Sequence, residues 1–180
     1  MADFSADRIK VKLAAYDSVW ASMAQEETTR LAAAIGDTLV SIAHVGSTAI
    51  PGIAAKPIID LQPVVHSLAA LDARRPHIEA LGYQWRGEFG LVGRRYCTRD
   101  RDGARLFQAH CYEAGNPEIA RTLVFRDYLR AHPAEAAAYE AVKREAAVAY
   151  PTDTLAYNDH KSAWILAARD RAEAWAARVK

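Results

Sequence analysis

Alternation of apolar and polar residues predicts strands in the first two thirds of the chain. Residues 38–45 are apolar on both faces of an extended strand, which indicates a central position in a sheet. Within residues 57–65, a period of two places Asp60 and Gln62 on one face and Leu61 on the other. Three further strands are predicted at 83–86, 91–98 and 104–113, with a hairpin turn at 101–103.

A helical period predicts the remaining elements. Two helices are expected, at 24–36 with Gly36 as C-cap and at 67–81 with Ser67 as N-cap. From residue 116 the chain is alanine-rich and helical, with Pro117 and Pro133 in first-turn positions. Trp164 and Trp175 share a stripe with small apolar residues, which is typical of buried packing anchors.

The order of these elements, strands and then helices, predicts one α+β domain. It spans residues 1–180, with an α/β core at 1–115 and a helical part at 116–180 packed on it. A chain of 180 residues is long enough to bury a sizeable core.

Composition narrows the function classes. The net charge of +1 gives no bulk field for nucleic acid or an anionic membrane. No apolar run approaches the roughly 20 residues of a membrane span. The first ten residues are charged and lack an apolar centre, so we expect no signal peptide and a cytoplasmic location. Cys97 and Cys111 fall in strand-like runs and are expected to be buried thiols rather than a disulfide or a zinc site.

The stretch HVGSTAIPGIAAKPIIDLQ, residues 44–62, contains the candidate chemistry. Gly46 and Ser47 at a strand-to-helix turn would offer backbone N–H groups and a helix N-terminus to phosphate. Lys56 would add a positive charge, and Asp60 could hold a magnesium ion. Phosphate binding beside a metal-bound carboxylate suits nucleotidyl or phosphoryl transfer. A plain turn with a structural aspartate fits the same spacing.

This stretch resembles the opening motif of the GrpB family, also described as UPF0157. The block FQAHCYEAGNPEIARTLVFRDYLRAHPAEAAAYEAVKREAA and the segment YNDHKSAWI resemble later parts of the family, in order. The resemblance implies a nucleotidyltransferase-superfamily fold, with a mixed or antiparallel sheet flanked by helices. It also implies that Gly46 and Ser47 form the family's Gly-Ser turn, that Asp60 is its first acid, and that Lys161 contacts ligand.

The second acid of that superfamily is replaced by Gln62, and the later strand presents Gln108, His110 and Tyr112 rather than a carboxylate. The two-metal arrangement is incomplete as a result. A transition-metal set of His44, His110 and Asp60 is one alternative, since imidazole suits zinc, manganese or iron. Structural hydrogen bonds are the alternative for each histidine.

Five arginines crowd one hairpin, at positions 94, 95, 99, 101 and 105. They form either a solvated edge or a phosphate clamp at the mouth of the site, with Arg94 on the opposite face from Arg95.

Two main hypotheses follow. The first is a nucleotidyltransferase-like enzyme that uses a nucleoside triphosphate and Mg²⁺ or another divalent cation. The second is a non-catalytic or metal-dependent module that binds a nucleotide or a coenzyme A-like phosphorylated ligand. A docking role for the helical tail is a third option. The candidate residues are Asp60, Ser47 and His110 for catalysis; Gly46, Ser47, Thr48, Lys56, Arg95 and Lys161 for the phosphorylated ligand; and Asp60, Gln62, His110 and His44 for metal.

Overall fold

A five-stranded mixed sheet forms the centre of the computed structural model, which describes residues 11–179. The first ten residues, on which the expected lack of a signal peptide depends, lie outside the described part. The strand order is β1-β2-β5-β4-β3, and the β2–β5 pair is parallel whereas the other pairs are antiparallel. The strands are β1 (Leu39–Val45), β2 (Ile59–Val65), β3 (Tyr83–Trp85), β4 (Arg94–Arg101) and β5 (Ala104–Glu113).

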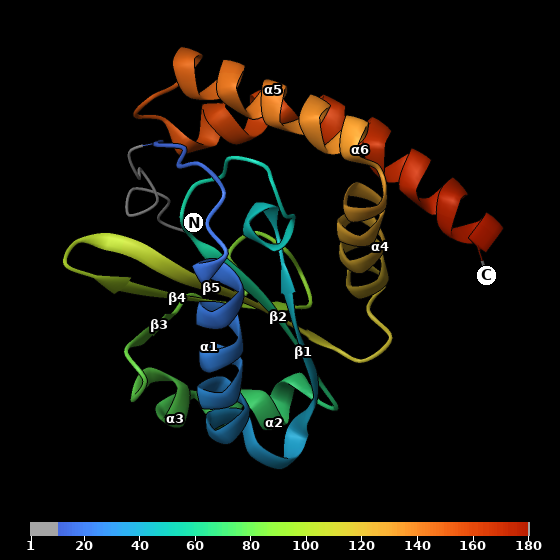
Figure 1. Ribbon diagram of the computed structural model, residues 1–180. Helices are drawn as coiled ribbons and strands as arrows, with labels where there is room; N and C mark the ends of the chain where they lie inside the picture. Colours follow the sequence, from blue (N-terminus) through green and yellow to red (C-terminus); the bar gives the residue numbers. More distant parts are fainter. Residues whose placement is uncertain (1–10, 180) are drawn as a thin grey trace.

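Helices cover both sides of this sheet. They are α1 (Val19–Ile35), η2 (Gly36–Thr38), η3 (Ser47–Ala49), α2 (Leu68–Ala73), α3 (Arg75–Glu79), α4 (Pro117–Ala131), α5 (Pro133–Ala149) and α6 (Thr154–Val179). Figure 1 shows α5 and α6 side by side along the top, α4 below them, and α1 crossing the sheet. The predicted α+β architecture with a C-terminal helical segment is confirmed. Among the described helices, none combines the length and apolar character that a membrane span requires.

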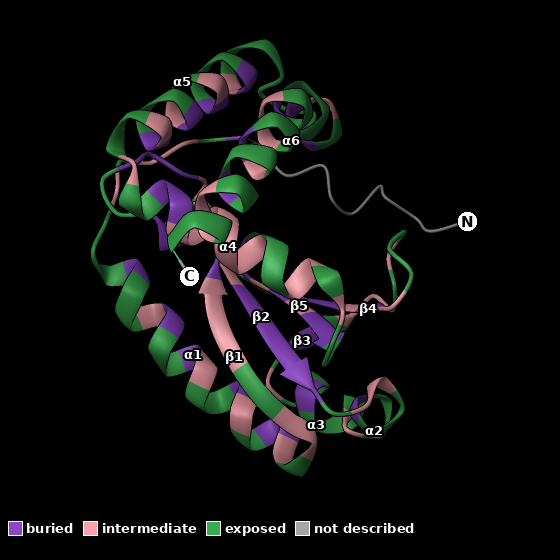
Figure 2. Ribbon diagram, turned by 90° about the vertical axis from the view of Figure 1, so that its right-hand side faces the viewer, coloured by how far each residue is buried: buried purple, intermediate pink, exposed green. Residues whose placement is uncertain are grey.

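The face of the sheet under α1, α2 and α3 is the main apolar core. Ile59 and Leu61 of β2 and Phe107 of β5 are buried there against Leu31 and Ile35 of α1. In Figure 2, β2 is buried along almost its whole length. Cys97 and Cys111 are free, buried thiols in this core, as predicted.

A second apolar cluster holds the C-terminal helices together. Trp164 stacks on Tyr139 with ring centroids 5.2 Å apart, and Trp175 lies 5.9 Å from the Tyr128 ring. Both tryptophans are partly buried against this cluster, as their spacing predicted. Pro133 starts α5 and Pro117 starts α4, as expected.

Two expectations about the first half of the chain are wrong. β1 lies at the edge of the sheet rather than at its centre, because its two apolar faces pack against α1 and α4 instead of between two strands. α1 begins five residues earlier than expected, at Val19, whose N–H donates to the Asp17 carboxylate at 2.9 Å.

The helix expected at 67–81 is broken into α2 and α3. Ser67 does cap α2, where it accepts from Ala70 N–H. The break comes at Arg74, because Pro76 has no N–H to continue the helical hydrogen bonds. The Arg74 side chain donates to Ala34 O at 2.9 Å and holds the break against α1.

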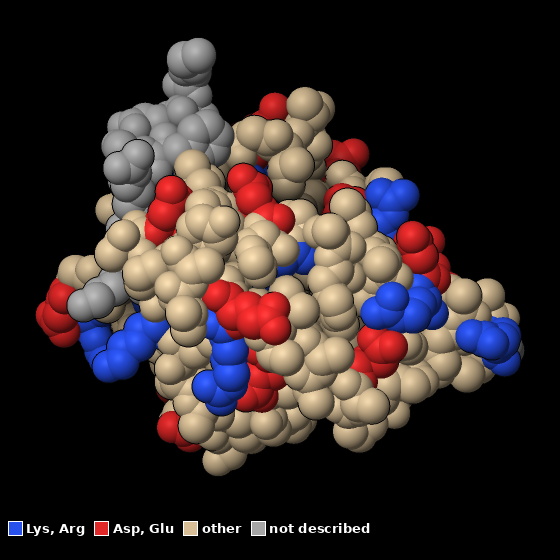
Figure 3. Space-filling view, turned by 90° about the horizontal axis from the view of Figure 1, so that it is seen from above, with Lys and Arg blue, Asp and Glu red and all other residues tan. Residues whose placement is uncertain are grey.

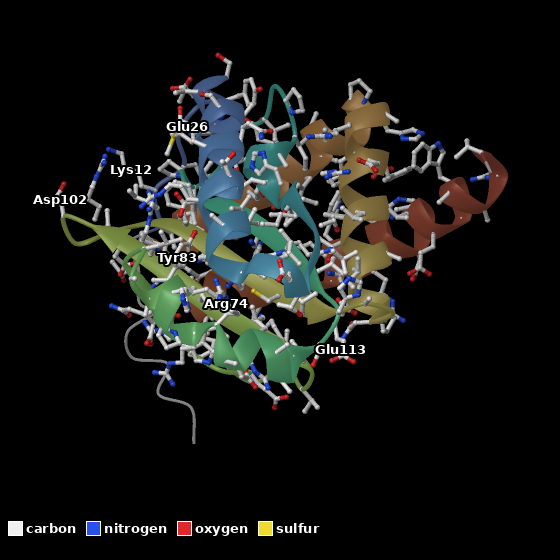
Figure 4. All side chains as sticks on the ribbon, turned by 90° about the horizontal axis from the view of Figure 1, so that it is seen from below. Lys12, Glu26, Arg74, Tyr83, Asp102 and Glu113 are labelled. Carbon is white, nitrogen blue, oxygen red and sulfur yellow. The ribbon has the colours of Figure 1, made fainter. Side chains whose placement is uncertain are left out.

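The strand expected at 91–98 begins only at Arg94. Gly87, Gly90 and Gly93 all have positive φ angles, and Phe89 has φ 46°, so the backbone before Arg94 forms a loop rather than an extended strand. The β4–β5 turn is at Asp102 and Gly103, both with positive φ, as a two-residue type I′ hairpin requires. In Figure 4, Asp102 lies at the tip of this hairpin.

Candidate functional site

A cavity of about 740 Å³ lies on the polar face of the sheet, with α6 forming part of its wall. It is lined by residues from the 44–62 stretch, from β4 and β5, and from the start of α6. The chemically active side chains among them are Ser47, Lys56, Asp60, Arg94, His110 and Lys161. The sheet alternation therefore does what the sequence predicted, because Ser47, Asp60 and His110 open onto one space.

Glycine is required at position 46 by two independent features. Its φ of 71° and ψ of −172° lie in a region that is open essentially to glycine alone. A Cβ at this position would also collide with the Asp60 carboxylate. The turn and the acid are thus packed against each other, although they are 14 residues apart in the chain.

The segment after Gly46 differs from the expected helix. Ser47–Ala49 form a single 3₁₀ turn, so no helix N-terminus faces the cavity at this point. The Ser47 hydroxyl donates to the Tyr139 hydroxyl of α5 at 3.3 Å. Thr48 is buried, and its hydroxyl donates to Ile58 O at 3.2 Å. Any contact to phosphate here would come from side chains and the turn itself.

Helix α4 fixes the backbone on both sides of this turn. The Arg126 guanidinium donates to His44 O at 2.9 Å, and Arg130 donates to Ala49 O at 2.8 Å. Arg126 Nε also forms an ion pair with Oδ1 of the half-exposed Asp127 at 2.8 Å. Both arginines act on carbonyls of the turn and are absent from the cavity lining.

Helix α5 fixes the segment that leads to Lys56. The Glu140 carboxylate accepts from Ala54 N–H at 3.0 Å, and the buried Lys143 ammonium donates to Ala54 O. Burial lowers the pKa of Lys143 to about 8, and its Nζ lies 4.7 Å from the Tyr139 ring centroid. One helix therefore holds both backbone groups of a residue next to the site.

Asp60 and His110 form the polar centre of the cavity. His110 Nε2 lies 3.5 Å from Asp60 Oδ1, and His110 Nδ1 lies 3.5 Å from Arg94 Nη1. Arginine can only donate, so this geometry places the lone pair of Nδ1 toward Arg94 and the N–H of Nε2 toward Asp60. Both side chains are about a quarter exposed, which leaves them accessible from the cavity.

His44 does not join this centre. Its Nε2 lies 3.0 Å from the Thr48 hydroxyl, which already donates its only proton to Ile58 O, so Nε2 must carry the hydrogen. Burial lowers the pKa of His44 to about 4, so the ring is neutral near pH 7. This hydrogen bond is the structural alternative expected for His44, and its role as a metal ligand stays a prediction.

Gln62 does not face the cavity either. Its side chain is buried beneath α4, where Nε2 donates to Ile119 O at 3.2 Å. Within residues 11–179, no group of three or more histidine, cysteine, aspartate or glutamate side chains is placed to hold a metal ion. The predicted set of Asp60, Gln62, His110 and His44 is not brought together in the cavity lining, because Asp60 and His110 face the cavity whereas Gln62 is buried and the half-buried His44 lies outside the lining.

Two lysines approach one aromatic ring in the cavity wall. Lys161 Nζ lies 4.1 Å from the centroid of the Tyr157 ring, and Lys56 Nζ lies 5.1 Å from the same centroid. Burial, together with the charges of Lys56 and Lys143, lowers the pKa of Lys161 to about 7. Lys56 and Lys161 line the same cavity as Gly46 and Ser47, and their contact with a ligand stays a prediction.

Arg95 is turned away from the cavity. It pairs with Asp72 of α2 at 2.6 Å, on the opposite face of the sheet. Arg94, its neighbour, lines the cavity instead, so the two faces were assigned correctly but the wrong arginine was chosen. Arg99 lies on the same side as Arg95, where it pairs with the buried Glu27 at 2.9 Å.

The loop before β4 was missed entirely by the sequence argument. Arg94 donates to Phe89 O at 2.8 Å and to Glu88 O at 3.2 Å, which folds the loop back over the strand. Phe89 then lies 5.2 Å from the Tyr96 ring, and Tyr96 lies 5.0 Å from His110. The run of closely spaced glycines was the available signal that an extended strand could not begin at 91.

The fold and the cavity together define a mixed α/β protein whose polar sheet face opens into a lysine-lined cavity. The sequence profile described as GrpB protein matches residues 10–171. The chain belongs to the GrpB family, as its motifs indicated.

Curated relatives show the same relationship over nearly the whole chain. The UPF0157 protein YqkA of Bacillus subtilis is 41% identical over 92% of this chain, which spans only 48% of YqkA. The UPF0157 protein SCO7215 of Streptomyces coelicolor is 35% identical, and the match covers 93% of this chain and 87% of that protein. A dephospho-CoA kinase of Mycolicibacterium paratuberculosis is 34% identical over 94% of this chain and 47% of its own length.

A solved structure supports the fold. The conserved protein GrpB of Enterococcus faecalis superposes with a TM-score of 0.86 at 35% identity, covering 91% of this chain and 99% of that one. The Cid1 poly(U) polymerase superposes with a TM-score of only 0.49 at 12% identity, a level of likeness that says nothing about function.

Proposed function

We propose that the cavity binds a phosphorylated small molecule of the size of a nucleotide or a coenzyme A fragment. The observation that carries this proposal is the convergence of Lys56 and Lys161 with the Gly46–Ser47 turn on the walls of one cavity. Lysine ammonium groups are compact charges suited to phosphate oxygens. The volume of about 740 Å³ is within the usual range of small-molecule sites.

The overall charge of the molecule does not explain a preference for an anionic ligand, so that preference must come from side chains in the cavity. Net charge is +1, and Figure 3 shows both signs of charge interspersed on the face over α5 and α6. Attraction for an anion is therefore local, at Lys56 and Lys161. The relatives named dephospho-CoA kinase make coenzyme A compounds a reasonable first choice of ligand to test.

Calorimetric titration with inorganic pyrophosphate, ATP and coenzyme A tests the proposal. Lys56→Ala should weaken the binding of each by about tenfold, equivalent to ~1.4 kcal/mol. Lys12→Ala is the matched control, because Lys12 is exposed and does not line the cavity, and it should change affinity less than twofold. Equal losses in the two variants, or no binding by any of the three compounds, would refute the proposal.

Nucleotidyl transfer is a second candidate, favoured by the packing of Gly46 against Asp60 beside Ser47. The donor set does not match two metal ions held between neighbouring carboxylates of the sheet, since Gln62 is buried beneath α4 and the other carboxylate that lines the cavity, Asp159, comes from α6. It fits a single magnesium ion shared between Asp60 and the ligand's phosphates, which would neutralise phosphate charge. Asp60 would hold that ion, and Lys56 would orient the phosphates.

Pyrophosphate release from nucleoside triphosphates, measured with and without magnesium, separates the two candidates. Transfer predicts a magnesium-dependent release that Asp60→Asn abolishes while the fold, followed by circular dichroism, stays intact. Binding alone predicts no release and a thermal stabilisation by ATP that persists when magnesium is chelated.

A further inference from the structure

Phosphate binding alone does not account for the surroundings of Lys161. Its side chain is only 8% exposed, and among the described residues none forms a hydrogen bond or an ion pair with its Nζ. Lys161 nevertheless lines the cavity. Its Nζ is not among the fully buried polar atoms that lack a hydrogen-bond partner in residues 11–179, so the nitrogen keeps some exposure there. A lysine that serves only as a fixed charge gains from a nearby carboxylate, and this one rests on an aromatic ring instead.

The neighbours of Lys161 favour an uncharged amine. Lys56 approaches the same Tyr157 ring, and Lys143 lies behind Tyr139, so two further ammonium groups surround the site. Asp60, on the far wall, is the acidic group that opposes them. Burial and these cations lower the pKa of Lys161 to about 7, so a large fraction of the side chain is the free amine at neutral pH. A desolvated lysine next to another cation is a typical amine nucleophile.

We propose that Lys161 is the nucleophile of a carbonyl-binding site, and that its Nζ captures the aldehyde or ketone group of a phosphorylated ligand as an imine. This inference rests on the phosphate-binding role proposed above, since Lys56 and the Gly46–Ser47 turn would hold the phosphate while the carbonyl carbon meets Nζ. It narrows the ligand class to phosphorylated carbonyl compounds.

The chemistry balances with groups that line the cavity. The Nζ lone pair forms a bond to the carbonyl carbon, and the π electrons of the C=O bond move to oxygen. The oxygen then leaves as water, with both protons that the free amine carried, and a C=N bond remains. Asp60 and His110, 3.5 Å apart on the facing wall, are the groups available to pass these protons.

Trapping with pyridoxal 5′-phosphate and sodium borohydride, followed by peptide mass mapping, tests the inference. Borohydride reduces the imine to a stable secondary amine, so each reacting lysine is marked. We expect Lys161 to be marked at least tenfold faster than the exposed Lys12, and pyrophosphate to protect Lys161 alone. Equal rates at the two lysines, or marking of Lys56 or Lys143 in place of Lys161, would overturn the inference.

Two controls separate this inference from the binding role on which it rests. Lys161→Arg keeps a cation and removes the nucleophile, so it should lose the adduct at position 161, whereas Lys12→Arg should leave that adduct unchanged; pyrophosphate binding by the parent protein is measured in parallel. Pyridoxal without its phosphate should mark Lys161 more slowly than pyridoxal 5′-phosphate. If pyrophosphate binds but Lys161 is not marked preferentially, only the imine is refuted; if pyrophosphate neither binds nor protects, the binding role itself is refuted.

Discussion

Arg94 and Arg95 are neighbours on β4, yet they belong to different parts of the molecule. Arg95 lies over α2 and pairs with a half-exposed aspartate, as charges at the border of an apolar core commonly do. Arg94 lies on the cavity face, only 8% exposed, where it bonds loop carbonyls and touches His110. The same residue type therefore forms an ion pair beside the core on one face of the sheet and holds the geometry of the cavity on the other.

The two faces of the sheet differ in the same way. Beneath α1 the strands contribute Ile59, Leu61 and Phe107 to a closed core, whose stability comes from burial. On the other face, Asp60 and His110 remain partly exposed between helices that hold the backbone around them. The comparison indicates that polar contacts between distant segments, rather than apolar packing, set the shape of the cavity.

The largest effect is expected at Gly46. Gly46→Ala should lower the free energy of unfolding by about 3 kcal/mol and abolish pyrophosphate binding, because it adds backbone strain and a collision with Asp60. Gly52→Ala is the matched control, since Gly52 has φ 82° but no atom within 4 Å of an added Cβ, and it should cost about 1 kcal/mol. Urea unfolding measures both, and equal losses would show that the contact with Asp60 is unimportant.

The arginine pair is expected to give the next largest contrast. Arg94→Ala removes charge-assisted hydrogen bonds to two loop carbonyls and should cost about 2–3 kcal/mol. Arg95→Ala removes a partly exposed ion pair and should cost less than about 1 kcal/mol. Thermal and urea unfolding of the two variants side by side would measure this difference. A larger loss in the Arg95 variant would contradict the distinction between the faces.

Stability should also depend on the pH through Lys161. Its pKa falls from 10.5 to about 7 on folding, because burial and the charges of Lys56 and Lys143 lower the pKa more than the charge of Asp60 raises it. The unfolded chain therefore binds more protons between these values, so this group's contribution to stability is present above pH 10.5 and is lost as the pH falls to about 7.

Replacing Lys161 by Met should remove this pH-dependent loss of stability, because methionine carries no charge at any pH. The variant should be more stable than the parent protein by about 2 kcal/mol at pH 7 and by much less at pH 10. Urea unfolding at the two pH values measures the difference, with Lys12→Met as the exposed control. A gain that is the same at both values would mean that Lys161 is not desolvated as the geometry indicates.

The smallest effect is expected at Gln62. Gln62→Leu removes a hydrogen bond to Ile119 O and should cost about 1 kcal/mol. Because the side chain lies beneath α4, pyrophosphate affinity should stay within twofold of the parent value, as measured by calorimetry. A tenfold loss would place Gln62 in the site after all.

Local patterns in the sequence predicted the strands well, but they predicted the contacts between helices, strands and loops poorly. The strand at 104–113 was predicted with the bounds of β5, and alternation placed Asp60 and His110 on a common face. These features depend on neighbouring residues alone. The roles of Arg94, Tyr139 and Lys143 depend on which helix packs over which loop, and no pattern in a single sequence reports that packing.

The failures have similar physical causes. The edge position of β1 was hidden because its apolar pattern does not differ from that of a central strand, although only Val45 of this strand is buried. Gln62 was assigned to the metal site by spacing, whereas α4 covers its end of the strand and leaves only Asp60 exposed. Alternation predicts on which face of the sheet a side chain lies, but it does not predict which part of that face the helices leave uncovered.

The two hydrogen bonds between α5 and Ala54 also bear on the stage of folding at which the site can form. Glu140 and Lys143 are 86 and 89 residues later in the chain, so these two contacts with Ala54 form only after α5 has left the ribosome, whereas the backbone pairing of Ala55 with Ala14 can form earlier. Closing a loop of this length carries an entropic cost that the complete helical region must offset. A nascent chain would thus hold its sheet strands before it could hold a ligand, and ligand capture would be confined to finished molecules.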